Sequence, residues 1–353
     1  MRELNLEDYG LPAGVLENDG NTLPARVIAV HRERYELVCQ HGQIFGKLKS
    51  GVYFDGSSEE FPTAGDFVLI QYNTQGESLI VQTLPRKSYF SRKDPGKGRG
   101  EQAVAANFDY VFIMQSLNQD FNPKRLERYI TLAWQSGASP VLVLTKADLL
   151  DDWQDHMEEA SQIALGVDVH AVSALDGTGL ESLSSHFKPR TTVVFLGSSG
   201  VGKSSLVNRL AGKDIMDVGE IREDDDRGRH TTTHRQLIML DNGAMIIDTP
   251  GMRQVGMWDV STGLGEAFSD VESYFSDCRF SDCQHKTEPG CAVVEALERG
   301  DLSWERWESY LKLKREAKYS EDKIAYQQSQ KEFGKNISKW NKQKKKIRGE
   351  ARW

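Results

Sequence analysis

The sequence of 353 residues contains no apolar run long enough to cross a bilayer, which argues against a membrane protein. Its first residues, MRELNLEDYGLPAG, lack the basic start and apolar stretch of a secretory signal. Hydrophobic residues make up 39% of the chain, which is low but ordinary for a soluble globular protein. We therefore expect a cytoplasmic protein without membrane contact.

Cysteine is also scarce, because the chain has only four. Three of them belong to the pattern Cys278-x4-Cys283-x-His285-x5-Cys291. A reducing cytosol disfavours disulfides, so clustered thiols there usually indicate a metal site. Three thiolates and one imidazole suit tetrahedral zinc with no open position, which predicts one structural zinc ion. The fourth, Cys39, lies in a β-like pattern and is expected in a core.

Charge is distributed unevenly along the chain. The net charge is -8, yet residues 331–353 hold nine Lys or Arg against two Glu. An acidic body with a basic tail is typical of nucleic-acid binders.

The length predicts more than one domain. Residues 1–21 are expected to form a flexible leader. Residues 22–90 contain about five short alternating runs separated by turn residues, which favour a small β-barrel of the OB-fold type. An SH3-like barrel or an open sheet is the alternative. The basic, glycine-rich segment 87–102 is expected to be a mobile linker or an RNA-facing loop.

From Tyr110 onward, apolar strands alternate with helical patterns, which predicts a parallel sheet with helices on both faces. We assign residues 91–264 to this α/β domain. Residues 265–353 should form a zinc-binding, α-helical domain with the basic tail. A helical stripe of Trp304, Trp307 and Leu311 in that domain is expected to pack in its core.

A phosphate-binding loop of the type G-x-x-x-x-G-K-S begins at Gly197. A buried strand precedes it and a helix follows, as the motif requires. Its backbone N–H groups and the helix N-terminus would hold a polyphosphate, Lys203 would reach the β- and γ-phosphates, and Ser204 would bind Mg²⁺. The expected nucleotide-binding residues of this segment are Gly197, Ser198, Ser199, Gly200, Val201, Gly202, Lys203, Ser204 and Ser205.

Two further strand ends indicate which base is bound. The first carries Thr145-Lys146-Ala147-Asp148, and the second carries Ser173 and Ala174 before Leu175. The Asp148 carboxylate can accept hydrogen bonds from guanine N1–H and from its exocyclic amine. Adenine presents a lone pair at N1, a mismatch that costs several kcal/mol when buried. Lys146 would lie along the base, and the N–H of Ala174 would meet the guanine carbonyl. The pattern therefore predicts GTP and GDP as ligands.

Switch elements follow the phosphate loop. Asp248-Thr249-Pro250-Gly251 matches D-x-x-G, in which Asp248 would hold Mg²⁺ through water and Gly251 would sense the γ-phosphate. The segment GRHTTTHR, residues 228–235, offers a threonine for Mg²⁺. We favour Thr232, with Thr233 as the alternative.

The position after Gly251 is Met252, which cannot orient a water molecule as glutamine does in many GTPases. A low intrinsic rate is therefore expected. His230, in the first switch, is the candidate for that role, alongside Lys203 and Thr232 as the other catalytic candidates. The alternative for His230 is packing or partner binding.

The order of these motifs is permuted, since the base-reading motifs precede the phosphate loop. With the barrel, TKAD, GSSGVGKSS, GRHTTT, DTPG and the Cys-Cys-His-Cys cluster, the chain resembles the ribosome small-subunit-dependent GTPase family RsgA/YjeQ. The resemblance implies an OB-fold, a circularly permuted GTPase domain and a zinc domain. It also implies slow GTP hydrolysis that the small subunit and its rRNA stimulate. This activity would act late in subunit maturation, and hydrolysis would drive release of the protein itself or of an assembly factor.

Two other functions are compatible with parts of the sequence. A GTP-binding RNA scaffold with negligible turnover would fit Met252, whereas the complete set of Mg²⁺ ligands favours hydrolysis. An ATPase is disfavoured by Asp148. We expect a monomer.

Overall fold

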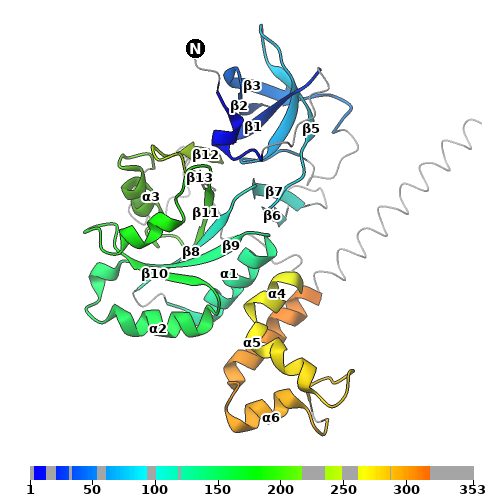
Figure 1. Ribbon diagram of the computed structural model, residues 1–353, viewed down its shortest axis with the longest axis vertical. Helices are drawn as coiled ribbons and strands as arrows, with labels where there is room; N and C mark the ends of the chain where they lie inside the picture. The colour runs from blue at the N-terminus through cyan, green and yellow to red at the C-terminus, as the bar shows by residue number, and fades with distance from the viewer. Residues whose placement is uncertain are drawn as a thin grey trace, which may run out of the picture.

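The computed structural model describes residues 4–12, 21–31, 34–53, 61–93, 101–117, 121–216, 235–248, 261–286 and 288–318. Figure 1 shows a barrel at one end, a sheet with helices in the middle and a small helical domain at the other end.

The N-terminal domain is a closed barrel of five strands. The strands are β1 (Leu23–Val30), β2 (Tyr35–Cys39), β3 (Gly42–Leu48), β4 (Phe67–Gln71) and β5 (Ser78–Thr83). Their order is β1-β2-β3-β5-β4, and β4 pairs back with β1. Among the described strands of the barrel, the β3–β5 pairing alone is parallel. Alternate side chains, including the fully buried Cys39, fill the barrel. The OB-fold prediction and the core position of Cys39 are confirmed.

The central domain is built on six strands joined to the barrel. It contains β8 (Tyr110–Ser116), α1 (Pro123–Gln135), β9 (Ser139–Thr145), η2 (Ala147–Leu149), α2 (Trp153–Ile163), β10 (Asp168–Val172), η3 (Leu180–Ser185), β11 (Thr192–Gly197), α3 (Lys203–Ala211), β12 (Gln236–Met239) and β13 (Met245–Asp248). The order is β10-β9-β8-β11-β13-β12, and only β12 runs antiparallel to its neighbour in this sheet.

Both faces of this sheet are covered, as the sequence predicted. In β8, Val111 and Ile113 belong to the core that includes Leu126 of α1. The intervening Phe112 and Met114 belong to a second core with residues of α3. This alternation follows from the period of two in a strand, and a strand buried on both faces reads as a continuous apolar run.

A buried arginine joins the barrel to the central sheet. Arg26 of β1 is 1% exposed and donates to the carbonyl oxygens of Gly65 (3.2 Å) and Asn107 (3.0 Å). It also donates to the hydroxyl of Thr192 in β11, over 3.1 Å. Burial lowers the pKa of its guanidinium to about 10, so it stays charged at neutral pH. A buried charge needs such partners, and these contacts fix the junction.

Two segments that were expected to be loose contain ordered structure. Within the leader, η1 (Leu6–Tyr9) buries Leu6, and Leu11 is buried just after it. The ends of the basic segment pair as β6 (Tyr89–Lys93) and β7 (Glu101–Ala106). In both cases the apolar side chains of the segment pack into the neighbouring hydrophobic core. Residues 94–100 lie outside the described part.

The C-terminal domain consists of helical segments and contacts α1 through α4 and through its last helix. They are α4 (Ser261–Ala267), α5 (Ser269–Glu272), η5 (Ser273–Asp277), α6 (Ala292–Arg299) and a helix over residues 304–318. Figure 1 shows α4 beside α1. Arg306 pairs with Glu127 of α1 (3.0 Å) and with Asp270 (2.9 Å). A side chain at Gly263 would place its Cβ 2.3 Å from the Thr131 carbonyl oxygen, so this close approach requires glycine.

The expected Trp stripe is partly wrong. Trp307 is buried, but Trp304 is 60% exposed, because the helix begins at residue 304 and its first turn extends beyond the packed surface.

Candidate functional site: a nucleotide cavity and a Cys-His cluster

The nucleotide motifs meet at one edge of the central sheet. Thr145, Gly197 and Asp248 are the last residues of β9, β11 and β13, and Ser173 directly follows β10. These strands are parallel, so their carboxyl ends lie at the same edge. Ligands of open α/β sheets bind at that edge.

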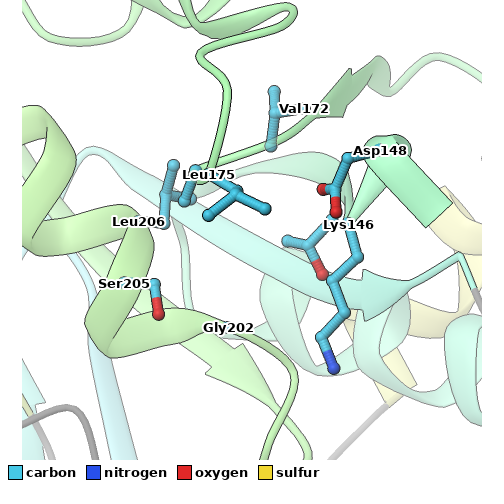
Figure 2. A pocket seen from close by; sticks show the side chains of 9 residues that line it. Lys146, Asp148, Val172, Leu175, Gly202, Ser205 and Leu206 are labelled. Atoms are coloured by element: carbon cyan, nitrogen blue, oxygen red, sulfur yellow. The ribbon is translucent and has the colours of Figure 1, made fainter.

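A cavity of about 130 Å³ lies between these strand ends and α3. Figure 2 shows Lys146 and Asp148 on one side of it and Leu206 on the other. The apolar side chains suit the faces of a flat base, and the carboxylate suits its edge. The lining residues are Thr145, Lys146, Asp148, Val172, Ala174, Leu175, Gly202, Ser205 and Leu206.

The structure thus brings the two base-reading motifs together with part of the phosphate loop. Sequence reasoning did not name Val172, Leu175 or Leu206 as lining residues. Their positions in the sequence could have identified them as lining residues, because each lies next to a motif residue. Leu175 lines this cavity and is 82% exposed.

The backbone at the TKAD motif has an uncommon conformation. Lys146 has φ 61° and ψ 41°, in the left-handed region. A non-glycine residue there carries strain of about 1 kcal/mol or more, which the surrounding structure must offset, and such residues cluster at functional sites. The turn into η2 places Asp148 at the cavity, while Ala147 is buried beneath it.

Thr145 links the base side of the cavity to the phosphate loop. Its hydroxyl donates to the carbonyl oxygen of Val201 over 2.5 Å and lies 3.3 Å from that of Gln115. Thr145 is 4% exposed, so these bonds are protected from water. A hydroxyl offers fewer hydrogen bonds than the amide of asparagine, but it makes the contact that joins the two loops.

The loop after β10 is held by its own side chain. The Ser173 hydroxyl accepts from the backbone N–H groups of Leu175 (3.2 Å) and Asp176 (3.3 Å). Ser173 is fully buried, and Ala174 faces the cavity. This arrangement fixes the position of the Ala174 backbone that sequence reasoning assigned to the guanine carbonyl.

The phosphate loop runs from Gly197 to the start of α3. A side chain at Gly197 would place its Cβ 2.9 Å from the Met114 carbonyl oxygen. Gly202 has φ 100°, a conformation that favours glycine, and it is the N-cap of α3. Ser204 and Ser205 lie in the first turn of that helix, where N–H groups remain available to an anion.

Lys203 and Asp248 form an ion pair in this structure. The Lys203 ammonium lies 2.6 Å from a carboxylate oxygen of Asp248, and both side chains are partly buried. Sequence reasoning assigned Lys203 to phosphates and Asp248 to a magnesium ion. Each group therefore has a counter-ion that a nucleotide and its cation would replace.

Several expected site residues lie outside the described residues. They are His230, Thr232 and Thr233 of the first switch, Gly251 and Met252 of the second, and the basic tail. Their assigned roles stay predictions.

The four residues of the Cys-His pattern come together beside α6. Their ligand atoms all lie within 4.8 Å of one another. His285 Nδ1 is 3.5 Å from Cys278 Sγ and 3.6 Å from Cys291 Sγ. Bonds of about 2.3 Å to sulfur and 2.0–2.1 Å to nitrogen place tetrahedral ligands roughly 3.5 Å apart, so the donor set fits zinc.

The two titratable groups of the cluster with shifted pKa values reflect desolvation and their crowded neighbours. Desolvation and the neighbouring thiols raise the pKa of Cys283 to about 11, which favours the protonated thiol when no cation lies nearby. Desolvation, followed by the charge of Lys314, lowers the pKa of His285, which favours the neutral imidazole that metals bind. Phe275 stacks on the His285 ring at 4.3 Å and holds its orientation.

Comparison with known proteins identifies the family to which the chain belongs. The family model for the RsgA GTPase matches residues 83–258. Small ribosomal subunit biogenesis GTPase RsgA 1 of Listeria monocytogenes is 46% identical over 89% of this chain and 90% of its own. The RsgA protein of Methanosarcina acetivorans is 42% identical over 89% of this chain and 83% of its own. The chain belongs to the RsgA GTPase family.

Solved structures agree with this assignment. YjeQ from Thermotoga maritima superimposes with a TM-score of 0.64 at 25% identity, covering 84% of this chain and 98% of its own. YloQ, described as a circularly permuted GTPase, gives a TM-score of 0.61 at 24% identity. The predicted family, the permuted fold and the assignment of the chain as a GTPase are confirmed. Within the described residues, no helix combines the length and apolar character that a membrane span requires.

Proposed function

We propose that this GTPase acts on the small ribosomal subunit during its biogenesis. The observation that carries the proposal is the 46% identity over 90% of a relative named for that process, combined with a cavity lined by Asp148 and Ala174. We further propose that the subunit stimulates a slow intrinsic rate late in maturation, and that hydrolysis drives release of the protein or of an assembly factor.

The residues around the cavity support a division of roles. Asp148 reads the guanine edge, and Ala174 donates its N–H to the guanine carbonyl. Lys203 and the backbone of the phosphate loop hold the β- and γ-phosphates. The hydrogen bond from the Thr145 hydroxyl to the Val201 carbonyl oxygen holds the base side of the cavity and the phosphate loop in a fixed relative position.

Magnesium bound with the nucleotide would neutralise charge that develops between the phosphates. Ser204, Asp248 and Thr232 are the residues proposed to hold it. Gly251 is proposed to contact the γ-phosphate, and His230 to orient the attacking water. An imidazole at this position would hold and polarise the attacking water. Glutamine performs that role in many GTPases, and Met252 cannot perform it.

We propose that the Cys-His cluster holds one structural zinc ion. The donor set and its spacing support this assignment. The ion would stabilise a segment of short helices, and this domain packs directly on α1 of the GTPase domain. The basic tail is proposed to contact rRNA.

The proposal is tested by measuring phosphate release from GTP by the full chain, alone and with purified small ribosomal subunits. Large subunits at equal RNA concentration are the control, and Lys203→Ala reports contaminating hydrolysis. We expect stimulation of more than about tenfold by small subunits only, equal to at least about 1.4 kcal/mol. Equal rates with both subunits would reject the small-subunit assignment, and no turnover would indicate a GTP-binding scaffold.

A further inference from the structure

A second group of side chains with metal-ligating atoms lies on the GTPase domain, apart from the cavity and the Cys-His cluster. Asp168, His170 and His186 present ligand atoms that all lie within 4.8 Å of one another. Asp168 and His170 are two residues apart in β10, so they share one face of that edge strand. His186 is the C-cap of η3.

The distances within this group match those of a tetrahedral metal site. The Nε2 atoms of His170 and His186 are 3.2 Å apart. His186 Nε2 is 3.6 Å from an Asp168 carboxylate oxygen. Ligands at about 2.0–2.1 Å from a tetrahedral ion lie roughly 3.3 Å apart. The Asp168 side chain is 72% exposed, so no packing prevents the small movement that would bring its carboxylate into ligand position.

The hydrogen bonds around His170 direct its ring toward the group. Its Nδ1 is 2.9 Å from the Ser182 hydroxyl. That hydroxyl donates its one hydrogen to the Gly179 carbonyl oxygen over 2.7 Å. With the hydroxyl hydrogen on the Gly179 carbonyl, the Ser182 oxygen accepts from His170 Nδ1–H, and the lone pair of Nε2 then faces His186. A metal-bound histidine is normally oriented by such a bond from its other nitrogen.

His186 is held in place by aromatic rings. Tyr110 and Phe112 contact it edge-on, with ring centroids 4.9 and 5.8 Å away. The residue is only 5% exposed, whereas Asp168 is open to solvent. The group is therefore fixed on the protein side and accessible to ions and water on the other.

We propose that Asp168, His170 and His186 bind one zinc ion, with water as the fourth ligand. Two imidazoles and one carboxylate favour a first-row transition metal over Mg²⁺ or Ca²⁺, which prefer oxygen ligands. Zinc in this position ties β10 to η3. The segment between them carries Ser173 and Ala174, so the ion fixes both ends of a loop that lines the nucleotide cavity.

Cobalt binding to the full chain tests the proposal, because Co²⁺ substitutes for zinc and its spectrum distinguishes thiolate from nitrogen ligands. Metal-free protein is titrated with Co²⁺ and bound metal is measured by elemental analysis. We expect two ions per wild-type chain and one per His170→Ala chain, with the thiolate-to-cobalt absorption of the Cys-His cluster unchanged in the variant. Cys291→Ser should lose that absorption and keep the second ion.

Two further variants separate metal binding from damage to the fold. His41→Ala removes an exposed imidazole of the barrel and should retain both ions. Ser182→Ala should weaken the second site about tenfold, since it removes the orienting hydrogen bond and no ligand. One ion in the wild type, or two in His170→Ala, would overturn the proposal and leave a simple hydrogen bond between the two histidines.

Discussion

The hydroxyl of Thr145 donates a hydrogen bond to the carbonyl oxygen of Val201 over 2.5 Å, and this bond joins the base-reading strand end to the phosphate loop. The two residues are 56 positions apart in the chain. Both are buried, at 4% and 2% exposure, so water does not compete for the bond. It therefore links the two loops that follow β9 and β11 beside the cavity.

Thr145→Val should lower affinity for GTP and GDP by roughly tenfold. The substitution keeps the shape of the side chain but leaves the Val201 carbonyl without this donor, at a cost of about 1–3 kcal/mol. Thr145→Ser retains the hydroxyl and serves as the matched control, which should bind like wild type. Equilibrium binding of a fluorescent guanine nucleotide measures the effect, and unchanged affinity in Thr145→Val would contradict a role for the hydroxyl.

His230→Ala should leave nucleotide binding nearly intact and lower subunit-stimulated turnover by more than about tenfold, or at least about 1.4 kcal/mol on the barrier. The reason is that Met252 cannot orient water. Lys203→Ala provides the contrast, because it should remove most of the binding itself. Normal stimulated hydrolysis by His230→Ala would show that the imidazole has another role.

Cys291→Ser should lose the zinc of the Cys-His cluster and destabilise the C-terminal domain by several kcal/mol. Cys291 is buried at the N-cap of α6, so the helix start loses its anchor. Cys39→Ser tests a buried thiol outside the cluster and should retain the metal. Elemental analysis and thermal unfolding measure the two effects, and full zinc content in Cys291→Ser would contradict the assignment.

Deletion of residues 331–353 should weaken binding to small subunits and flatten its salt dependence. Each lost phosphate contact lowers the slope of log affinity against log salt by ~0.7–0.9. The segment has nine cationic residues with Phe333 and Trp340 among them. Binding measured across a salt series provides the test, and an unchanged slope would mean that the tail is only solvated.

Much of this architecture could be predicted because local patterns and motif residues determine it. Alternating strands with turn residues indicated the barrel, and the phosphate loop placed β11 and α3 around Gly197 and Lys203. The Cys-His spacing likewise predicted a cluster that the fold then assembles. Each of these features depends on residues close together in the sequence.

Contacts between distant segments were not predictable in the same way. Arg26 lies in an alternating strand, where a charge normally faces water, yet the carbonyl oxygens of Gly65 and Asn107 and the Thr192 hydroxyl surround it. The pairing of Lys203 with Asp248 depends on how β11 and β13 lie together. His170 and His186 are 16 residues apart, with no ligand spacing that sequence alone would recognise.

The central claim is that the cavity beside Asp148 reads guanine, and Asp148→Asn tests it most directly. The substitution removes the charge and places an NH₂ donor against the donor groups of guanine, so GTP binding should fall by roughly 2–4 kcal/mol. Xanthine carries a carbonyl where guanine carries its amine, and that carbonyl can accept from the new NH₂. Competitive binding of GTP and xanthosine triphosphate to wild type and variant should therefore show a shift of preference toward xanthosine triphosphate, while an unchanged preference for GTP would contradict the account.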